Sequence, residues 1–296
     1  MPLTRLTEVK APAHPAEFDL TSFLFKQNEI GMKTTKEKTK PERTKKEKKE
    51  EKGDLTKPEK ILQFLTNPIS RVYSLFLKRA IPIFDIGNQI LQKEEPCIHI
   101  LLPTLEMQLE KVLLSFCKPE HVITMMNEIG RGIKPTITSE NQLPDEELSI
   151  GHDTHTFIQS QVNLELQPFF RGVRKFFSSA ADYMVSKYPF GDELLKHAVV
   201  VDIAKRRLVK FRSLRFFLCR FPSVLPEEVT VDQVEVEFRM YQTTSFDDSI
   251  LNKRIDEAWQ GIGLLKRGGK EVFSNISVVM LGILVIFYSN AMRQSN

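Results

Sequence analysis

The sequence predicts a mainly α-helical protein, and three observations support this fold class. Large apolar residues recur at helical spacing along most of the chain from residue 58 to about residue 262. Alternation of apolar and polar residues over the length of a β-strand is hard to find there. Breakers such as Pro189 and the run KRGGK (266–270) stand where helical patterns end. We therefore expect an α-helical domain over residues 58–270.

Two long amphipathic helices are predicted first. In TLEMQLEKVLLSF (104–116) the apolar residues fall at i, i+4, i+7, i+8 and i+11, which places them on one helical face. That face consists of Leu105, Leu109, Val112, Leu113 and Phe116. In FFRGVRKFFSSAADYMVSKYPF (169–190) a similar pattern runs until Pro189 ends it. Its apolar face consists of Phe169, Val173, Phe176, Phe177, Ala180 and Met184.

Three shorter helices are predicted further along, over residues 213–221, 230–241 and 255–262. Thr230 and Gln233 have the spacing of a capping box at the start of the second of these. The three apolar faces are Leu214, Phe217, Leu218 and Phe221, then Val231, Val234, Phe238 and Tyr241, then Ile255, Ala258, Trp259 and Ile262. Residues 134–148 and 243–249 are polar and are expected to be loops.

Residues 1–57 are expected to be a disordered, lysine-rich segment. The run at 33–53 has no large apolar residue and cannot bury enough surface to offset its conformational entropy. Residues 32–60 hold 12 Lys and Arg against 7 Asp and Glu, a surplus of 12 − 7 = 5 positive charges. Such a run is typical of a solvated linker, a nuclear import signal or a nucleic-acid tether.

Composition and cysteine usage bound the class of protein. The chain has 296 residues, of which 41% are hydrophobic and 27% are charged, as in soluble globular proteins of one or two domains. Cys97, Cys117 and Cys219 lie far apart without CxxC spacing, and the first residues lack the apolar core of a signal peptide. We expect a reducing compartment, either the nucleus or the cytoplasm.

The sequence contains no recognisable catalytic motif. A Gly-rich phosphate loop, a GxSxG elbow and an HExxH motif are all absent. His152, Asp153 and His155 cluster in a polar connecting region but lack clear further metal ligands. Cys97 and His99 stand two apart on a predicted helix and would not share a face. We therefore expect no enzyme activity, no metal site and no cofactor.

The best candidate for a binding site is the basic segment AKRRLVKFRSLR (204–215). Apolar residues interleave with its cations, so that it could present positive charge to a phosphate backbone. The six candidate nucleic-acid-binding residues are Lys205, Arg206, Arg207, Lys210, Arg212 and Arg215. The alternative is a solvated helix face, or cations that pair with acidic neighbours inside the protein.

Several segments, in this order, resemble the C-terminal half of hAT-superfamily DNA transposases, in particular vertebrate domesticated proteins with BED-type zinc fingers. The similar segments are LKRAIPIFDIGNQILQKEEPCIHIL (77–101), LPDEELSIG (143–151), FFRGVRKFFSSAADYMVSKYPFGDELLKHAVVVD (169–202), LRFFLCRFPSVLP (214–226) and SVVMLGILVIFYSNA (277–291). The resemblance covers roughly residues 61–291. It implies that the α-rich body is the helical insertion domain of an RNase H-like transposase, followed by a truncated remnant of the RNase H-like core over residues 271–296.

The resemblance also implies a loss of catalysis. The family pattern after the apolar run resembles SNADCERIFS, whose glutamate is the third metal-binding acid, whereas this chain reads SNAMRQSN. The slot of the glutamate falls on Gln294, which carries no charge to a Mg²⁺ ion. A zinc-finger Cys/His set and the strands for the first two acids are also missing. We expect a transposon-derived, catalytically inactive protein with DNA or protein partners, and we do not carry over the family's dimerisation.

The apolar stretch near the end of the chain admits a second interpretation. A tail-anchored membrane protein could use residues 272–288, which basic residues flank on both sides. The uninterrupted apolar part, Ile276 to Tyr288, is shorter than the roughly 20 residues that span a bilayer. Its many β-branched residues also suit a buried strand or a packed helix. We therefore expect no membrane partner and keep the anchor as the alternative.

Overall fold

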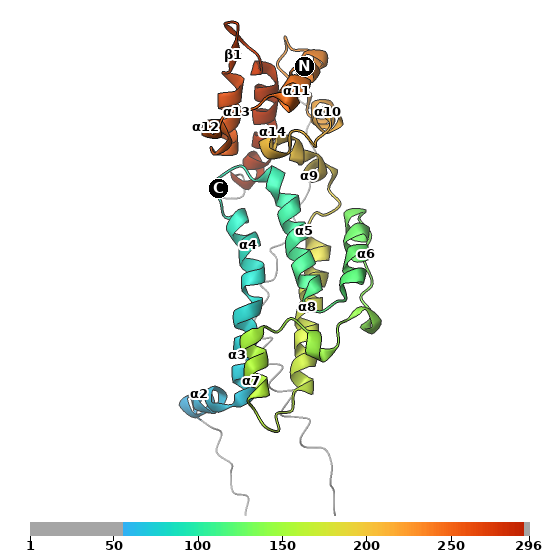
Figure 1. Cartoon of the computed structure of the whole chain (residues 1–296), viewed down its shortest axis with the longest axis vertical. Helices are drawn as coiled ribbons and strands as arrows, with labels where there is room; N and C mark the ends of the chain where they lie inside the picture. The colour runs from blue at the N-terminus through green and yellow to red at the C-terminus, as the bar shows by residue number, and fades with distance from the viewer. Residues whose placement is uncertain (1–55, 293–296) are drawn as a thin grey trace, which may run out of the picture. The chain divides into compact units, whose positions relative to one another are not determined.

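The computed structural model describes residues 56–292 of the chain (Figure 1). Residues from Pro58 onward form one compact unit, which continues past residue 270 without a division. The predicted disorder of residues 1–57 falls almost entirely outside the described residues, as does Gln294.

The described residues are mainly α-helical, which confirms the mainly α part of the predicted fold class. The helices are α2 (Lys57–Thr66), α3 (Pro68–Ala80), α4 (Pro82–Leu91), α5 (Ile98–Leu114), α6 (Pro119–Gly130), α7 (His152–Gln159), α8 (Gln167–Lys187), α9 (Glu193–Ala198), α10 (Phe211–Arg220), α11 (Val231–Thr243), α12 (Asp248–Leu251), α13 (Ile255–Gly263) and α14 (Ser274–Met292). Five 3₁₀ turns connect them, at η1 (Ser139–Asn141), η2 (Asp145–Glu147), η3 (Val199–Val201), η4 (Ile203–Lys205) and η5 (Pro222–Val224).

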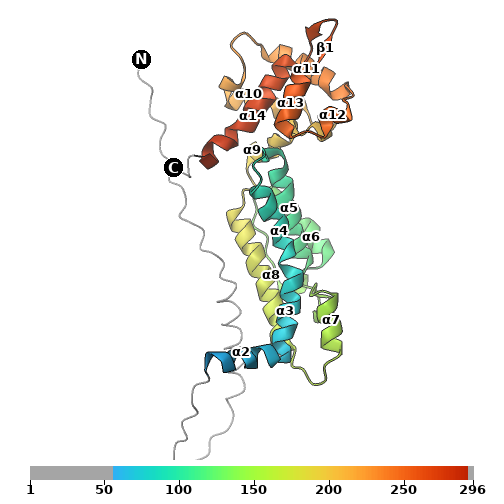
Figure 2. The same ribbon diagram turned by 90° about the vertical axis from the view of Figure 1, so that its left-hand side faces the viewer.

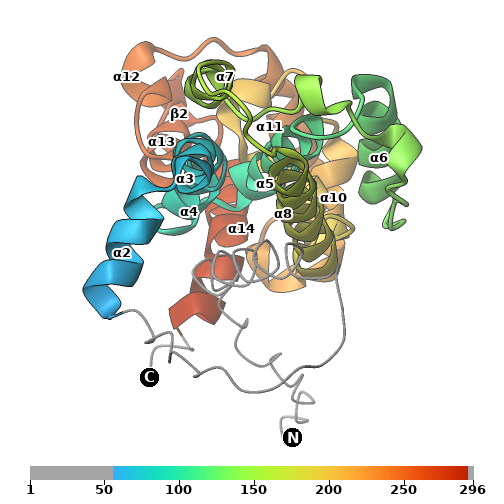
Figure 3. The ribbon, with the colours of Figure 1, turned by 90° about the horizontal axis from the view of Figure 1, so that it is seen from below.

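The helices fall into two groups. The first group contains α3 to α8 and is centred on α5. This helix packs against α4, α6 and α8, while α3 packs against α4 and α7 (Figure 2). Seen from below, α3 and α8 lie on either side of α5 (Figure 3). Phe76 of α3 contacts three phenylalanine rings of α8 edge to face, with ring centroids 5.6 to 6.0 Å apart. Such aromatic pairs add specific geometry to the burial of apolar surface.

The second group contains α9 to α14. It is connected to the first group through contacts of α5 with α9 and η3. Trp259 of α13 and Tyr241 of α11 are fully buried at its centre, with ring centroids 4.9 Å apart. The indole Nε1 of Trp259 donates a hydrogen bond of 2.8 Å to the carbonyl oxygen of Val201. This bond satisfies the one polar atom of the largest buried side chain.

The five predicted helices are confirmed, with small differences at their ends. α5 begins at Ile98 and continues through Pro103, because a proline in the second turn removes only one helical hydrogen bond. α8 ends at Lys187, two residues before Pro189, as predicted. The capping box at the start of α11 is present, since Thr230 and Gln233 satisfy each other's backbone N–H groups.

Several details of the sequence interpretation are wrong. Val231, predicted on the apolar face of α11, is exposed, and Phe221 and Ile255 are only half-buried. Ala180 is only half-buried, and Ala181 takes its place on the buried face of α8. His152 and its neighbours form helix α7 rather than a connecting region. The run KRGGK follows the end of α13, as predicted for a breaker, and it forms a small β-hairpin of β1 (Lys266–Arg267) and β2 (Lys270–Glu271), because Gly268 and Gly269 both adopt positive φ angles.

The apolar stretch near the end of the chain is helix α14, which is buried along one side. It makes its most extensive contacts with α13 and also packs against α11. Its buried residues are Ile276, Ser277, Val279, Met280, Ile283 and Leu284. Within residues 56–292 no helix combines the length and the apolar character needed to cross a membrane. The described part of the stretch therefore packs against its own chain along this side.

Candidate nucleic-acid interface and the adjoining pocket

The six predicted basic residues lie on one continuous segment. Lys205 ends the short turn η4, a tight turn follows, and α10 starts at Phe211. The six residues are neighbours in sequence, but the structure gives them different environments.

Arg206 is part of the folded structure. Its Nε donates to the carbonyl oxygen of Thr244 at 3.3 Å, and its Nη1 donates to the carbonyl oxygen of Ile203 at 3.1 Å. Its guanidinium also lies 5.2 Å from the centre of the Phe246 ring. These contacts hold the basic segment against the end of α11, so Arg206 is not free to bind a phosphate.

Lys205 and Arg215 have acidic partners within the protein. The Nζ of Lys205 lies 3.7 Å from Oδ2 of Asp202. The Nη2 of Arg215 lies 3.6 Å from Oε2 of Glu235 on α11. The proposed alternative, in which the cations pair with acidic neighbours, therefore applies to these two residues.

The other three predicted residues, Arg207, Lys210 and Arg212, have exposed side chains. None of them forms an ion pair or a side-chain hydrogen bond with the described part of the chain. Lys210 is the N-cap of α10, and no side chain caps this helix. The first turn of α10 also contains no acidic residue, so its positive dipole end adds to the three cations.

Gln242 fixes the shape of the turn that carries Arg207. Its Nε2 donates hydrogen bonds to the carbonyl oxygens of Arg206, at 3.0 Å, and Val209, at 2.8 Å. Leu208 lies at the outside of this turn with 82% of its surface exposed. No feature of the sequence pattern indicated the role of Gln242, because residue 242 is far from the turn in sequence.

His197 borders the start of α10. Its Nδ1 lies 3.1 Å from Oγ of Ser213, and its ring lies 4.4 Å from the Phe216 ring. Burial lowers the pKa of His197, although the carboxylate of Glu193 partly opposes this effect. The side chain therefore favours the neutral form near pH 7 and adds no fourth cation to this surface.

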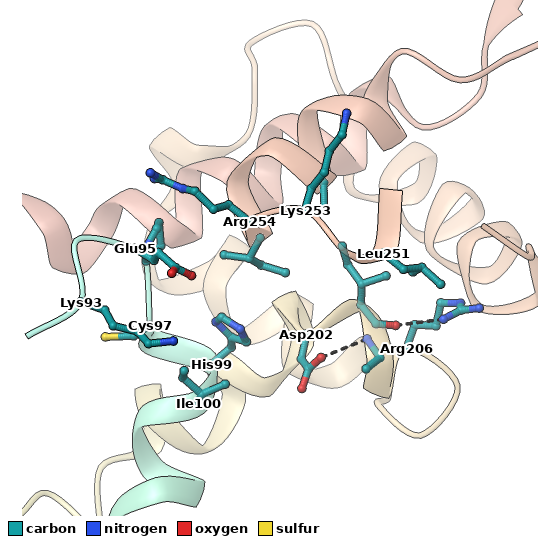
Figure 4. A pocket seen from close by; sticks show the side chains of 15 residues that line it. Lys93, Glu95, Cys97, His99, Ile100, Asp202, Arg206, Leu251, Lys253 and Arg254 are labelled. Atoms are coloured by element: carbon teal, nitrogen blue, oxygen red, sulfur yellow. Dashed lines mark hydrogen bonds between the residues drawn. The ribbon is translucent and has the colours of Figure 1, made fainter. Parts of the chain in front are cut away.

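A pocket of about 320 Å³ lies between the start of α5, the turn η4 and the start of α13 (Figure 4). Arg206 lines its edge, so the pocket adjoins the basic segment. It is lined by Lys93, Glu95, Pro96, Cys97, His99, Ile100, Asp202, Ile203, Ala204, Arg206, Leu251, Lys253, Arg254, Ile255 and Ala258.

One ionisable group of this pocket, His99, is half-buried. Its ring points into the pocket in Figure 4, and its buried Nδ1 forms no hydrogen bond with the described residues. Ile203 and Ala258, which also line the pocket, are almost completely buried. Burial lowers the pKa of His99, while the nearby Asp202 acts in the opposite direction. A neutral imidazole therefore borders the pocket at pH 7.

Charged side chains surround the mouth of the pocket. Lys93, Glu95, Lys253 and Arg254 are all exposed there. Arg254 is already paired, because its Nε and Nη2 donate to the two carboxylate oxygens of Asp256 at 3.1 and 2.9 Å. Glu95 directs its carboxylate toward the space above His99 (Figure 4). The mouth thus offers both cations and one carboxylate.

The sequence argument against a shared site for Cys97 and His99 is wrong. That argument assumed that both residues belong to one helix, whereas Cys97 is the N-cap of α5 and only His99 lies in its first turn. Both residues therefore line the same pocket. Within the described residues, however, no three His, Cys, Asp or Glu side chains are placed to hold a metal ion. Asp153, from the other histidine cluster, pairs instead with Lys78 at 3.1 Å.

The fold and the site define a mainly α protein with an exposed basic turn beside a pocket of mixed charge. Comparison with protein families, with curated proteins and with solved structures finds no match. The resemblance to hAT transposases therefore rests on the quoted segments alone.

Proposed function

We propose that this protein is a transposon-derived, non-enzymatic nucleic-acid-binding protein. Its binding surface is the exposed basic turn, which consists of Arg207, Lys210 and Arg212. The proposal takes the helical unit as a descendant of a transposase insertion domain, on the strength of the five similar segments. It takes the protein as inactive because Gln294 occupies the slot of the third metal-binding acid.

One observation carries the binding proposal: three exposed cations, none of which forms an ion pair with the described residues, lie at or just before a helix start that no side chain caps. Neighbouring like charges repel one another and oppose the helix dipole, and the carboxylate of Glu193 offsets this only at Arg212. A phosphate group removes both unfavourable effects, because it pairs with the cations and accepts from backbone N–H groups at a helix start. Phosphates are spaced regularly along nucleic acids, so several such contacts form at once.

The expected affinity is low and independent of base sequence. Three phosphate contacts give a slope of about −2.7 in a plot of the logarithm of the association constant against the logarithm of salt concentration. Such contacts position a protein on a duplex without reading its bases. The function that follows is to hold this protein on nucleic acid, either alone or together with a protein partner.

A salt series tests this proposal on the full chain. Fluorescence anisotropy of a labelled 20-bp duplex would be measured between 50 and 200 mM NaCl. We expect the association constant to fall at least about 40-fold over this range, because three contacts release three counterions and the lysine-rich segment can only add to them. Absence of binding at 50 mM NaCl, or an affinity that does not change with salt, would refute the proposed function.

A further inference from the structure

We propose that the pocket beside the basic segment binds a single nucleotide, with the base against its apolar walls and the phosphate at its cationic mouth. The free mononucleotide and a nucleotide unit within a nucleic acid share this chemistry. The inference goes beyond the proposed function, because a free mononucleotide could bind even if the exposed basic turn bound nothing.

The walls of the pocket suit a flat, largely apolar ring. Ile100, Leu251 and Ile255 line the space from three different elements, and the buried side chains of Ile203 and Ala258 also line it. Apolar side chains of this kind commonly hold an unstacked base on its two faces. The volume of about 320 Å³ lies at the lower end of the range of small-molecule sites, about 300 to 1,000 Å³.

Two polar groups of the lining match the edge of a base, namely the half-buried His99 and the exposed Glu95 at the mouth. The ring of His99 points into the pocket, and its buried Nδ1 has no hydrogen-bond partner within the described residues. The carboxylate of Glu95 is directed toward the same space and can accept from an exocyclic amino group. Adenine, cytosine and guanine carry such a group, whereas uracil and thymine do not. Amino-bearing bases should therefore bind more tightly.

The mouth of the pocket suits an anion. Lys93 and Lys253 are exposed there and form no ion pair with the described part of the chain. The N-terminus of α5 also opens at the pocket, and this helix has neither a side-chain cap nor an acidic residue in its first turn. Asp202, the second carboxylate of the lining, is already used, because it caps η4 and pairs with Lys205. A ligand that carries both an amino group and a phosphate thus matches the mixed charge of the pocket.

Isothermal titration calorimetry with adenosine 5′-monophosphate tests the inference on the full chain. Adenosine lacks the phosphate and ribose 5-phosphate lacks the base, so both should bind at least about fivefold more weakly. His99→Phe keeps a planar ring and removes both nitrogens, and Lys253→Glu reverses one charge at the exposed mouth. Each variant should weaken binding of adenosine 5′-monophosphate by a similar factor. Lys266→Glu, on the hairpin, is the matched control and should leave binding unchanged.

A competition experiment distinguishes the two sources of the nucleotide. If adenosine 5′-monophosphate displaces a labelled 12-nucleotide single strand, and Lys253→Glu weakens both ligands, the pocket holds a unit of the strand. If only the mononucleotide binds, the pocket serves the free molecule, and the inference stands without the proposed function. Absence of mononucleotide binding, or binding that both Lys253→Glu and His99→Phe leave unchanged, would overturn it. Lys253→Glu keeps the test decisive if His99→Phe fails to fold.

Discussion

The hydroxyl of Ser277 on α14 donates a hydrogen bond of 2.6 Å to the carbonyl oxygen of Trp259 on α13. Both residues are buried, so this bond ties the two helices together away from water. The bond forms because Gly263 of α13 leaves room for Ser277: a Cβ at residue 263 would lie 2.6 Å from its Oγ. The apolar segment near the end of the chain is thus fixed by a specific contact as well as by burial.

Gly263→Ala should therefore destabilise the fold. The added methyl group would push Ser277 away from Trp259, and we expect a loss of about 1 to 3 kcal/mol in the free energy of unfolding. Urea denaturation followed by circular dichroism would measure it. Gly261→Ala is the matched control, because its new Cβ would meet nothing closer than 3.9 Å. The control should gain stability from helix propensity, and equal losses in both variants would contradict the packing argument.

Glu237→Ala should loosen the start of α14. The carboxylate of Glu237 accepts hydrogen bonds from the backbone N–H of Ile276, at 2.8 Å, and from Nδ2 of Asn275, at 2.6 Å. It therefore acts as a cap supplied by another helix, and its loss should cost about 1 kcal/mol of unfolding free energy. Glu227→Ala, at an exposed carboxylate, should have little effect. A cost as large for Glu227→Ala would show that charge, rather than capping, is responsible.

The same substitution should lower the free energy of unfolding at Arg206 and leave it unchanged at Arg207. Arg206→Gln removes the donors to two backbone carbonyl oxygens and should cost about 1 to 3 kcal/mol of unfolding free energy. Arg207→Gln should leave stability unchanged within about 0.5 kcal/mol, because the side chain is exposed and unpaired. Thermal unfolding of the two variants under identical conditions would separate a structural arginine from a binding one.

Stability should fall as the pH is lowered from 7 to 5. Burial lowers the pKa of both His99 and His197 below the usual value of 6.5. The unfolded chain therefore binds protons more readily than the folded chain just below pH 6.5, so protonation favours unfolding in that range. His99→Phe should make the urea midpoint less sensitive to pH between 7 and 5. An unchanged pH dependence in this variant would exclude His99 as a contributor.

Tyr241→Phe should be neutral or stabilising. The hydroxyl of Tyr241 is buried and has no hydrogen-bond partner within the described residues, and burial raises its pKa. Removing this unsatisfied group should add up to about 1 kcal/mol to the free energy of unfolding. Trp259→Phe is the contrasting variant, because it removes a satisfied donor and a larger buried ring, and it should destabilise. Chemical denaturation of both variants would check the pair.

The helices could be predicted from sequence where a buried face repeats at helical spacing. This holds for α5, α8 and α11, whose apolar residues pack against neighbours as local periodicity requires. The hairpin at residues 266–271 was missed because glycine pairs terminate helices and also permit tight strand turns. The folding of α14 was undecided for a similar reason, since a segment that is apolar on all sides carries no periodic signal.

The candidate site was only partly predictable. A run of cations is visible in the sequence, but its members are distinguished by distant partners, such as Thr244 for Arg206 and Glu235 for Arg215. The pocket was invisible because its three walls come from segments more than 50 residues apart near Cys97, Ile203 and Ile255. The spacing of residues within one segment does not indicate contacts between distant segments.

The central claim is that Arg207, Lys210 and Arg212 bind nucleic acid, and two triple variants test it most directly. Arg207→Gln, Lys210→Gln and Arg212→Gln would be combined in one protein, and Arg171→Gln, Lys175→Gln and Lys187→Gln, at exposed cations of α8, in the other. Both variants lose three positive charges, so they differ only in where the charge is lost. In fluorescence anisotropy at 50 mM NaCl, we predict that the first variant binds a labelled duplex at least about tenfold more weakly than the second. Equal affinities of the two variants would contradict the account.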